Sequence, residues 1–93
     1  MAEVELQLLN IFALRTNKNN MVYEGQMVTE IIRKFVKEYR NLLDDNLLDK
    51  KKKKLNPQML VLLNGKNVNN GKSSKTKVKD GDKIYISYPI SGG

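Results

Sequence analysis

The chain has 93 residues, a formal net charge of +7, and no cysteine or histidine. This length supports a single domain, and the composition excludes disulfide scaffolds, thiolate zinc sites, cysteine nucleophiles and serine–histidine triads. No apolar run approaches the ~20 residues that a membrane span needs. The N-terminus does not resemble a signal peptide, so we expect a cytoplasmic protein without a membrane partner.

The positive charge is concentrated in one half of the chain. Residues 1–45 carry six basic and seven acidic side chains, whereas residues 46–93 carry eleven lysines and three aspartates. A basic half of this kind attracts nucleic acid or an acidic protein surface. It holds no arginine and only two aromatic residues, the types on which base recognition and stacking usually depend. The charge therefore favours electrostatic steering and argues against nucleic acid as the partner.

The N-terminal part of the sequence predicts a hairpin of two strands. Val4, Leu6 and Leu8 alternate with polar residues, which is the pattern of a strand with one buried face. Apolar residues continue at position 9 and at 11–14 and favour a strand end that is buried on both sides. A polar turn at 16–20 and a second strand at 21–24, closed by Gly25, complete the predicted hairpin.

One amphipathic helix is predicted next, from about Val28 to about Asn41. Glu30 lies in its first turn, where the helix dipole favours an acid. The apolar residues recur with the spacing of one helix face, at Val28, Ile31, Ile32, Phe35, Val36 and Tyr39. We expect this stripe to pack on one face of a sheet, against Val4, Leu6, Leu8, Leu60, Leu62, Ile84 and Ile86.

The middle of the chain predicts a loop followed by a short hairpin. Lysines 50–54 are consecutive, and such a run is usually solvated. The apolar run 59–63 has the length of a strand, and Asn64-Gly65 predicts a tight turn into a return strand. Asp80-Gly81-Asp82 predicts another turn.

The last predicted strand covers residues 84–88, with Ile84 and Ile86 on one face. Pro89 ends this strand because proline cannot donate to a β-ladder. The resulting order is β-β-α-β-β, which predicts an α+β fold with one mixed sheet and one main helix on a single face. We expect one domain at 1–89 and a flexible diglycine tail at 90–93.

The closing residues, Gly92-Gly93, suggest a chemical role for the tail. Two glycines form a thin thread that can enter a channel too narrow for side chains. A carboxylate at its end becomes an acyl donor once it is activated, for example as a mixed anhydride with AMP. A frayed end is the alternative interpretation of the same two residues.

The segment Lys79-Asp80-Gly81-Asp82-Lys83-Ile84, followed by Tyr88-Pro89-Ile90-Ser91-Gly92-Gly93, resembles the C-terminus of the MoaD/ThiS sulfur carriers. It also resembles the archaeal ubiquitin-like small modifiers. Phe12-Ala13-Leu14-Arg15 and Leu62-Leu63-Asn64-Gly65 are similar to the family's first and third strand ends. The resemblance implies a ubiquitin-like β-grasp fold and a carrier protein that is the substrate of an enzyme.

The resemblance also implies roles for the tail. Gly93 would be adenylated by an E1-like enzyme, which uses ATP, and no cofactor would be bound by this chain. Gly93 would then become a thiocarboxylate, for molybdopterin or tRNA thiolation, or an isopeptide link to lysine. Gly92 would line the entry channel, and Pro89, Ile90 and Ser91 would set the path of the tail.

The sheet face away from the helix is the expected partner surface. We predict that it contains Tyr85, Ser87 and Tyr88, together with Met59 and Val61. The expected partners are the E1-like enzyme and either a molybdopterin-synthase-type large subunit or lysines of target proteins. Tyr88 and Ser87 differ from the residues common in molybdopterin-type carriers, which have a second proline and a bulky apolar residue there.

Two other functions are compatible with the sequence. A small basic RNA-binding β-grasp module would depend on the lysines at 50–54 and not on Gly93. A structural interaction domain would use neither of these features.

Overall fold

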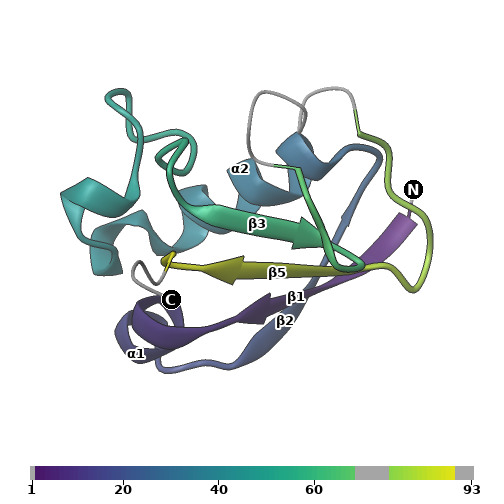
Figure 1. The fold of residues 1–93 in the computed structure, drawn as a ribbon, viewed down its shortest axis with the longest axis horizontal. Coiled ribbons are helices and arrows are strands. Elements are labelled where there is room, and N and C mark those ends of the chain that lie inside the picture. The colour runs from purple at the N-terminus through teal and green to yellow at the C-terminus, as the bar shows by residue number, and fades with distance from the viewer. Residues whose placement is uncertain (1, 69–75, 90–93) are drawn as a thin grey trace.

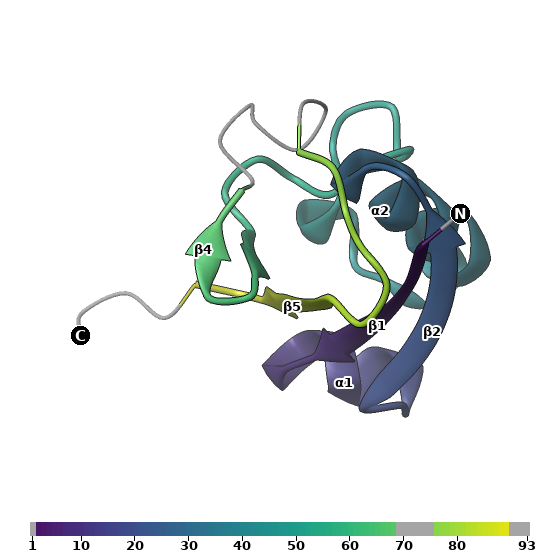
Figure 2. The ribbon, with the colours of Figure 1, turned by 90° about the vertical axis from the view of Figure 1, so that its right-hand side faces the viewer.

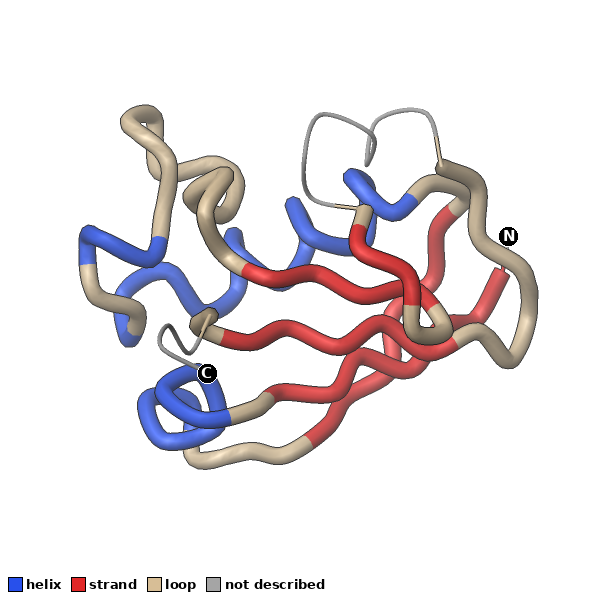
Figure 3. The backbone as a smooth tube through the Cα atoms, in the orientation of Figure 1, coloured by secondary structure: helices blue, strands red, loops and turns tan. Residues whose placement is uncertain are grey.

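The computed structural model describes residues 2–68 and 76–89 and shows a mixed sheet with one long helix across one face (Figure 1). The predicted α+β class is confirmed, and the elements of the predicted β-β-α-β-β order are present (Figure 3). To that order the structure adds short helices, one of them between the first two strands, and a two-residue strand before the last one. The elements in these ranges are β1 (Ala2–Leu8), α1 (Asn10–Thr16), β2 (Asn20–Gly25), α2 (Val28–Tyr39), the 3₁₀ turns Arg40–Leu42 and Asp45–Leu47, β3 (Leu60–Leu63), β4 (Lys66–Asn67) and β5 (Lys83–Ser87).

The strands of the described residues form one sheet in the order β2-β1-β5-β3-β4. β1 is antiparallel to β2 and parallel to β5, and β3 is antiparallel to both β5 and β4. The two strands nearest the chain ends, β1 and β5, therefore lie side by side in the middle of the sheet (Figures 1 and 2). This is the arrangement expected of a β-grasp fold.

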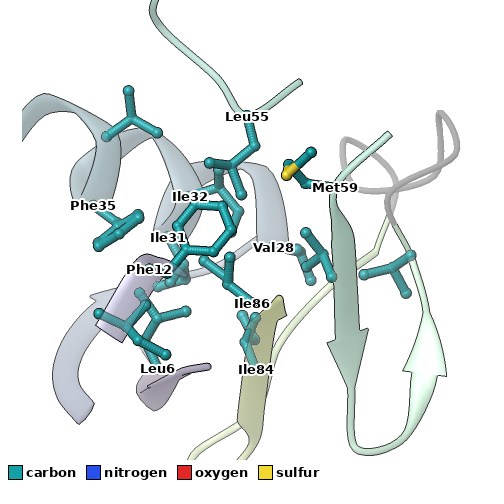
Figure 4. Packing of buried hydrophobic residues seen from close by; sticks show 14 of the residues in the cluster. Leu6, Phe12, Val28, Ile31, Ile32, Phe35, Leu55, Met59, Ile84 and Ile86 are labelled. Atoms are coloured by element: carbon teal, nitrogen blue, oxygen red, sulfur yellow. The ribbon is translucent and has the colours of Figure 1, made fainter. Parts of the chain in front are cut away.

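The core lies between α2 and the sheet. Five of the six residues of the predicted α2 stripe are buried, and Tyr39, the sixth, is half-buried against the core. The inward residues of β1 and β5 are buried as well. Figure 4 shows Ile31 and Ile32 of α2 meeting Phe12 of α1 and Ile86 of β5 in this space. Phe12 and Phe35 are the largest side chains with no exposed surface. One continuous core thus joins both helices to the central strands.

The strand expected to continue through residues 9–14 is absent, because the chain turns there into α1. Asn10 has a φ of 41°, a left-handed conformation that interrupts an extended strand. Phe12 and Thr16 are buried, whereas Leu14 is 70% exposed. Buried residues four positions apart lie on the same face of a helix, as Phe12 and Thr16 do here. A short apolar run does not distinguish this helix from a buried strand, which is why the prediction was wrong.

β3 presents the opposite face from the one predicted. Met59 and Val61 are buried in the core, with 4% and 1% of their surface exposed, while Leu60 and Leu62 are half-buried and lie outside the core cluster. The run 59–63 is apolar at every position, so its sequence carries no alternation that selects a face. The pairing of Val61 with Ile86 selects it instead, because directly paired residues share a face.

The predicted turns are confirmed at Asn64-Gly65 and Asp80-Gly81-Asp82. Asn64 and Gly65 have φ values of 49° and 93°, the left-handed pair that a two-residue hairpin needs. Gly81 has a φ of 87°. None of the helices in the described ranges has the length and apolar character to cross a bilayer.

Candidate functional site

β5 carries the chain towards the expected tail. It pairs on both sides, with β1 and with β3, so its direction is held by two ladders of backbone hydrogen bonds. Tyr88 and Pro89 follow its last residue, and Ile90, Ser91, Gly92 and Gly93 lie outside the described residues. The described part of the candidate site consists of Tyr88 and Pro89, which we call the root of the tail, and the sheet around them.

The side chain of Asn10 holds the root of the tail. Its Oδ1 accepts the backbone N–H of Tyr88 at 3.0 Å, and its Nδ2 donates to the carbonyl of Tyr88 at 3.1 Å. The same Nδ2 donates to Ser87 Oγ at 2.8 Å. One residue earlier, the N–H of Leu9 donates to the carbonyl of Ile86 at 3.0 Å. The side-chain carboxamide of Asn10 thus continues the hydrogen bonding between β1 and β5 beyond the last residue of β1.

The sequence contained only a weak signal for this contact. Asparagine tolerates the left-handed conformation better than most residues, and at Asn10 that conformation turns the chain away from β1. Oδ1 also accepts the N–H of Ile11 at 2.9 Å. An asparagine after a strand therefore indicates a local turn, but its partner 78 positions away follows only from the parallel pairing of β1 with β5.

Three residues of the predicted partner surface are not exposed. Met59 and Val61 belong to the core, and Ser87 is only 8% exposed. The hydroxyl of Ser87 accepts from Asn10 and donates to the carbonyl of Tyr88 at 3.0 Å. Ser87 therefore supports the strand end from within. Tyr88 is 43% exposed and Tyr85 is half-buried, so these two remain accessible to a partner.

Leu60 and Leu62 take the place of the two buried residues on the sheet face away from α2. Leu62 pairs directly with Tyr85, and Leu60 pairs with Ser87 at the end of β5. We call Leu60, Leu62 and Tyr85 the open-face patch. Half-buried apolar residues that adjoin one another can mark a partner surface. Sequence reasoning missed both leucines because it assigned the opposite face to β3.

The carboxylates of the Asp80-Gly81-Asp82 turn have structural partners. Asp80 Oδ1 accepts the N–H of Glu3 at 2.6 Å, and Asp82 Oδ2 accepts the N–H of Lys79 at 2.8 Å. Asp82 Oδ1 accepts from Asn64 Nδ2 at 3.0 Å. The described residues contain no group of acids arranged to hold a metal ion. This turn sets the start of β5, at the end of the strand opposite the tail.

The ThiS family matches this chain over residues 9–93. Among solved structures, small archaeal modifier protein 1 (SAMP1) from Methanosarcina acetivorans is 26% identical, with a TM-score of 0.77, over 100% of this chain and 98% of its own. SAMP1 from Haloferax volcanii is 18% identical, with a TM-score of 0.78, over 99% and 100% of the two chains. No curated protein matches the chain.

A third structure is a complex of subunits 1 and 2 of molybdopterin-converting factor from Helicobacter pylori. One of its chains is 21% identical, with a TM-score of 0.63, over 98% of this chain and 99% of its own. At this identity the similarity shows the fold alone. Together the structures confirm the predicted ubiquitin-like β-grasp fold, a five-stranded mixed sheet with one main helix.

Proposed function

This chain belongs to the ThiS family, and from that premise we propose that the carboxylate of Gly93 is its reactive group. Proteins of this kind are ubiquitin-like sulfur carriers or modifiers and not catalysts. The observation that carries the proposal is the family match itself, which extends through Gly92 and Gly93. The anchored root of the tail at Tyr88 supports it, because Asn10 holds the chain four residues before Gly92.

The proposed chemistry begins with an E1-like activating enzyme. A carboxylate oxygen of Gly93 attacks the α-phosphorus of ATP, pyrophosphate leaves, and an acyl adenylate forms. Hydrosulfide supplied by the sulfur source then attacks the acyl carbon, the bond to AMP breaks, and AMP leaves. The product is a thiocarboxylate. Attack by a lysine amine in place of sulfur gives an isopeptide bond, so both outcomes follow from one activated intermediate.

This chain contributes presentation and not catalysis. Gly92 has no Cβ and suits a narrow channel that leads to the nucleotide. Pro89, Ile90 and Ser91 are proposed to set the path between Tyr88 and that channel. Asn10 reduces the conformations available to the root of the tail, which lowers the entropy lost when the tail enters the enzyme.

The open-face patch, with Tyr88, is the proposed docking surface for the activating enzyme. An acceptor of the molybdopterin-synthase type is proposed to use the same surface after activation. The H. pylori structure supports this choice, since it is a complex between two subunits of a molybdopterin-converting factor. Lysines of target proteins are the alternative acceptors, through the isopeptide bond.

Mass spectrometry of the intact protein tests the proposal. The chain is incubated with an activating enzyme, ATP and a sulfur source, and a gain of about 16 Da is expected as sulfur replaces oxygen. Fragmentation should place the gain on Gly93. A variant that lacks Gly93, and one with a single alanine added after Gly93, should both stay unchanged. An unmodified wild type, or a gain elsewhere in the chain, would contradict the proposal.

A further inference from the structure

A basic groove of about 990 Å³ lies between α2 and the loop that holds the lysine run. Arg33, Lys37 and Arg40 line one wall, and lysines 50–54 line the other. The lining thus contains eight cationic side chains and a single carboxylate, that of Asp49. The two arginines come from the half of the sequence that has no excess of positive charge. Only folding brings them next to the lysines.

The lysine wall has an ordered backbone. Asp49 Oδ1 accepts the N–H groups of Lys53 at 3.0 Å and Lys54 at 3.3 Å, and the N–H of Asp49 donates to the carbonyl of Lys54 at 2.9 Å. Leu48 and Leu55 form a β-bridge at the base of the loop, and each is 4% exposed. The one carboxylate of the groove therefore organises the loop through backbone N–H groups, and a buried base holds the loop in place.

The charge of the groove is poorly compensated from within. Of its cations, Lys52 has an acidic partner, with Nζ 3.2 Å from Asp45 Oδ1. In the described part of the chain, no carboxylate lies within salt-bridge distance of Arg33, Lys37 or Arg40. Concentrating this much positive charge in one concavity is unfavourable until an anion enters. The groove therefore favours a ligand that carries several negative charges.

The residue types indicate phosphates in preference to an acidic protein segment. The groove lining contains no aromatic residue, and Leu48 and Pro57 are its only apolar residues. Protein interfaces usually depend on aromatic and apolar anchors at their centre. Guanidinium groups such as those of Arg33 and Arg40 match the oxygens of phosphate in two-pronged hydrogen bonds. Because unpaired bases need aromatic stacking surfaces, the lining also favours a duplex over a single strand.

The positions of the helical cations suit a linear polyanion. Arg33, Lys37 and Arg40 are four and three residues apart, so they share one face of α2 and its continuation over about 10 Å.

The groove and the end of β5 lie on different sides of the molecule. The lysine loop and the end of β5 are at the same end of the long axis (Figure 1), but Figure 2 shows the end of β5 and α2 on different sides. The groove lining accordingly contains no residue of β5 and neither Tyr88 nor Pro89.

We propose that the basic groove binds the phosphate backbone of a double-stranded nucleic acid, without reading its sequence. This inference goes beyond the proposed carrier function and does not require Gly93. It revises the sequence-based expectation against nucleic acid, which depended on the absence of arginine and the scarcity of aromatic residues in the basic half. The groove supplies the arginines, and binding to phosphates alone needs no aromatic residue. Binding through phosphates alone releases counterions, so the affinity should fall steeply with salt concentration.

Fluorescence anisotropy with a labelled RNA duplex, and with a DNA duplex of the same sequence, tests the proposal between 50 and 200 mM salt. The groove variant is Arg33→Gln/Lys37→Gln/Arg40→Gln. The control variant, Lys66→Gln/Lys77→Gln/Lys79→Gln, removes the same charge from exposed positions outside the groove. We expect the groove variant to bind at least tenfold more weakly. The slope of log affinity against log salt should become shallower by about 2 to 3 in the groove variant and by less than about 1 in the control.

A second variant, Lys51→Gln/Lys53→Gln/Lys54→Gln, tests the other wall and leaves α2 intact. It should weaken duplex binding to a similar degree, and thermal melts should show that all three variants remain folded. Equal losses in the groove and control variants would overturn the proposal, because net charge alone would then explain the affinity. It would also be overturned by absent binding at 50 mM salt, or by tighter groove-dependent binding of a polyglutamate peptide or of a single strand.

Discussion

The carboxamide of Asn10 holds both backbone groups of Tyr88, with its Oδ1 on the N–H at 3.0 Å and its Nδ2 on the carbonyl at 3.1 Å. The side chain of Asn10 thus makes the two hydrogen bonds to Tyr88 that the backbone of a longer β1 would otherwise make. The root of the tail is fixed by a residue that begins a different element, α1. Any account of how the tail is presented must therefore include the N-terminal part of the chain.

Asn10→Ala should release the root of the tail. The variant loses both hydrogen bonds to Tyr88 and places alanine at a φ of 41°, so we expect a loss of about 1–2 kcal/mol in the free energy of unfolding. The amide of Tyr88 should exchange with solvent faster, by roughly tenfold or more. We further expect a lower kcat/KM for activation by the E1-like enzyme. Hydrogen exchange by NMR and a pyrophosphate-release assay measure these effects.

Asn17→Ala is the matched control for Asn10→Ala. Asn17 also has a left-handed backbone, with a φ of 57°, but it caps the other end of α1. The substitution should cost similar stability through strain while the exchange rate of the Tyr88 amide stays unchanged. If both variants accelerate that exchange equally, the hydrogen bonds from Asn10 do not hold Tyr88 locally.

Leu62→Arg should interfere with docking at the open-face patch. Leu62 is half-buried on the face away from α2 and lies outside the core cluster, so the unfolding free energy should change by less than about 0.5 kcal/mol. The KM of this chain as a substrate of the activating enzyme should rise, by roughly tenfold or more if Leu62 anchors the contact. Steady-state kinetics of AMP formation provide the measurement.

Val22→Arg makes the same chemical change elsewhere on the sheet. Val22 is 57% exposed in β2, at the sheet edge opposite β4. The KM of the Val22→Arg variant as a substrate of the activating enzyme should match that of the wild type. A similar rise in both variants would assign the effect to added charge and remove support for the open-face patch.

Phe35→Ala should be severely destabilising. Phe35 has no exposed surface and packs at 5.5 Å between ring centroids against Tyr39. Its truncation leaves a cavity in the core, at a cost of about 3–5 kcal/mol in the free energy of unfolding. Urea denaturation checks this value. Leu14→Ala, at a residue that is 70% exposed, should change the same quantity by less than about 0.5 kcal/mol.

Tyr23 should make the stability of the protein sensitive to alkaline pH. Burial raises the pKa of Tyr23 above its usual value, and the hydrogen bond that its hydroxyl donates to Glu38 raises it further. The unfolded chain then loses this proton at a lower pH than the folded protein does. The stabilising contribution is therefore complete below about pH 10 and declines as the pH rises above it.

Tyr23→Phe provides the comparison for that pH dependence. The variant cannot ionise at this position, so its free energy of unfolding should fall less steeply above about pH 10 than that of the wild type. Chemical denaturation at several pH values between 8 and 11 measures both curves. Parallel curves would show that Tyr23 ionises equally in the folded and unfolded states.

Local patterns predicted the elements whose residues differ between faces. β1 alternates apolar and polar residues, and α2 has one apolar stripe, so each sequence specifies both the element and its buried side. The turn at Asn64-Gly65 was predictable for a similar reason, because its backbone conformation favours those residue types. α1 and the face of β3 were mispredicted, since residues 11–14 and 59–63 are apolar at every position and show no repeat that selects one structure.

The sequence by itself determined the fold class, the principal helix and the family resemblance of the closing residues. Tertiary structure decided which face of β3 is open, which residue holds Tyr88, and that Arg33 and Arg40 face the lysine run. The physical reason is that local patterns report how a residue interacts with its neighbours in the chain and with water. Contacts between residues far apart in sequence depend on strand register and on packing against α2, which exist only once the sheet has formed.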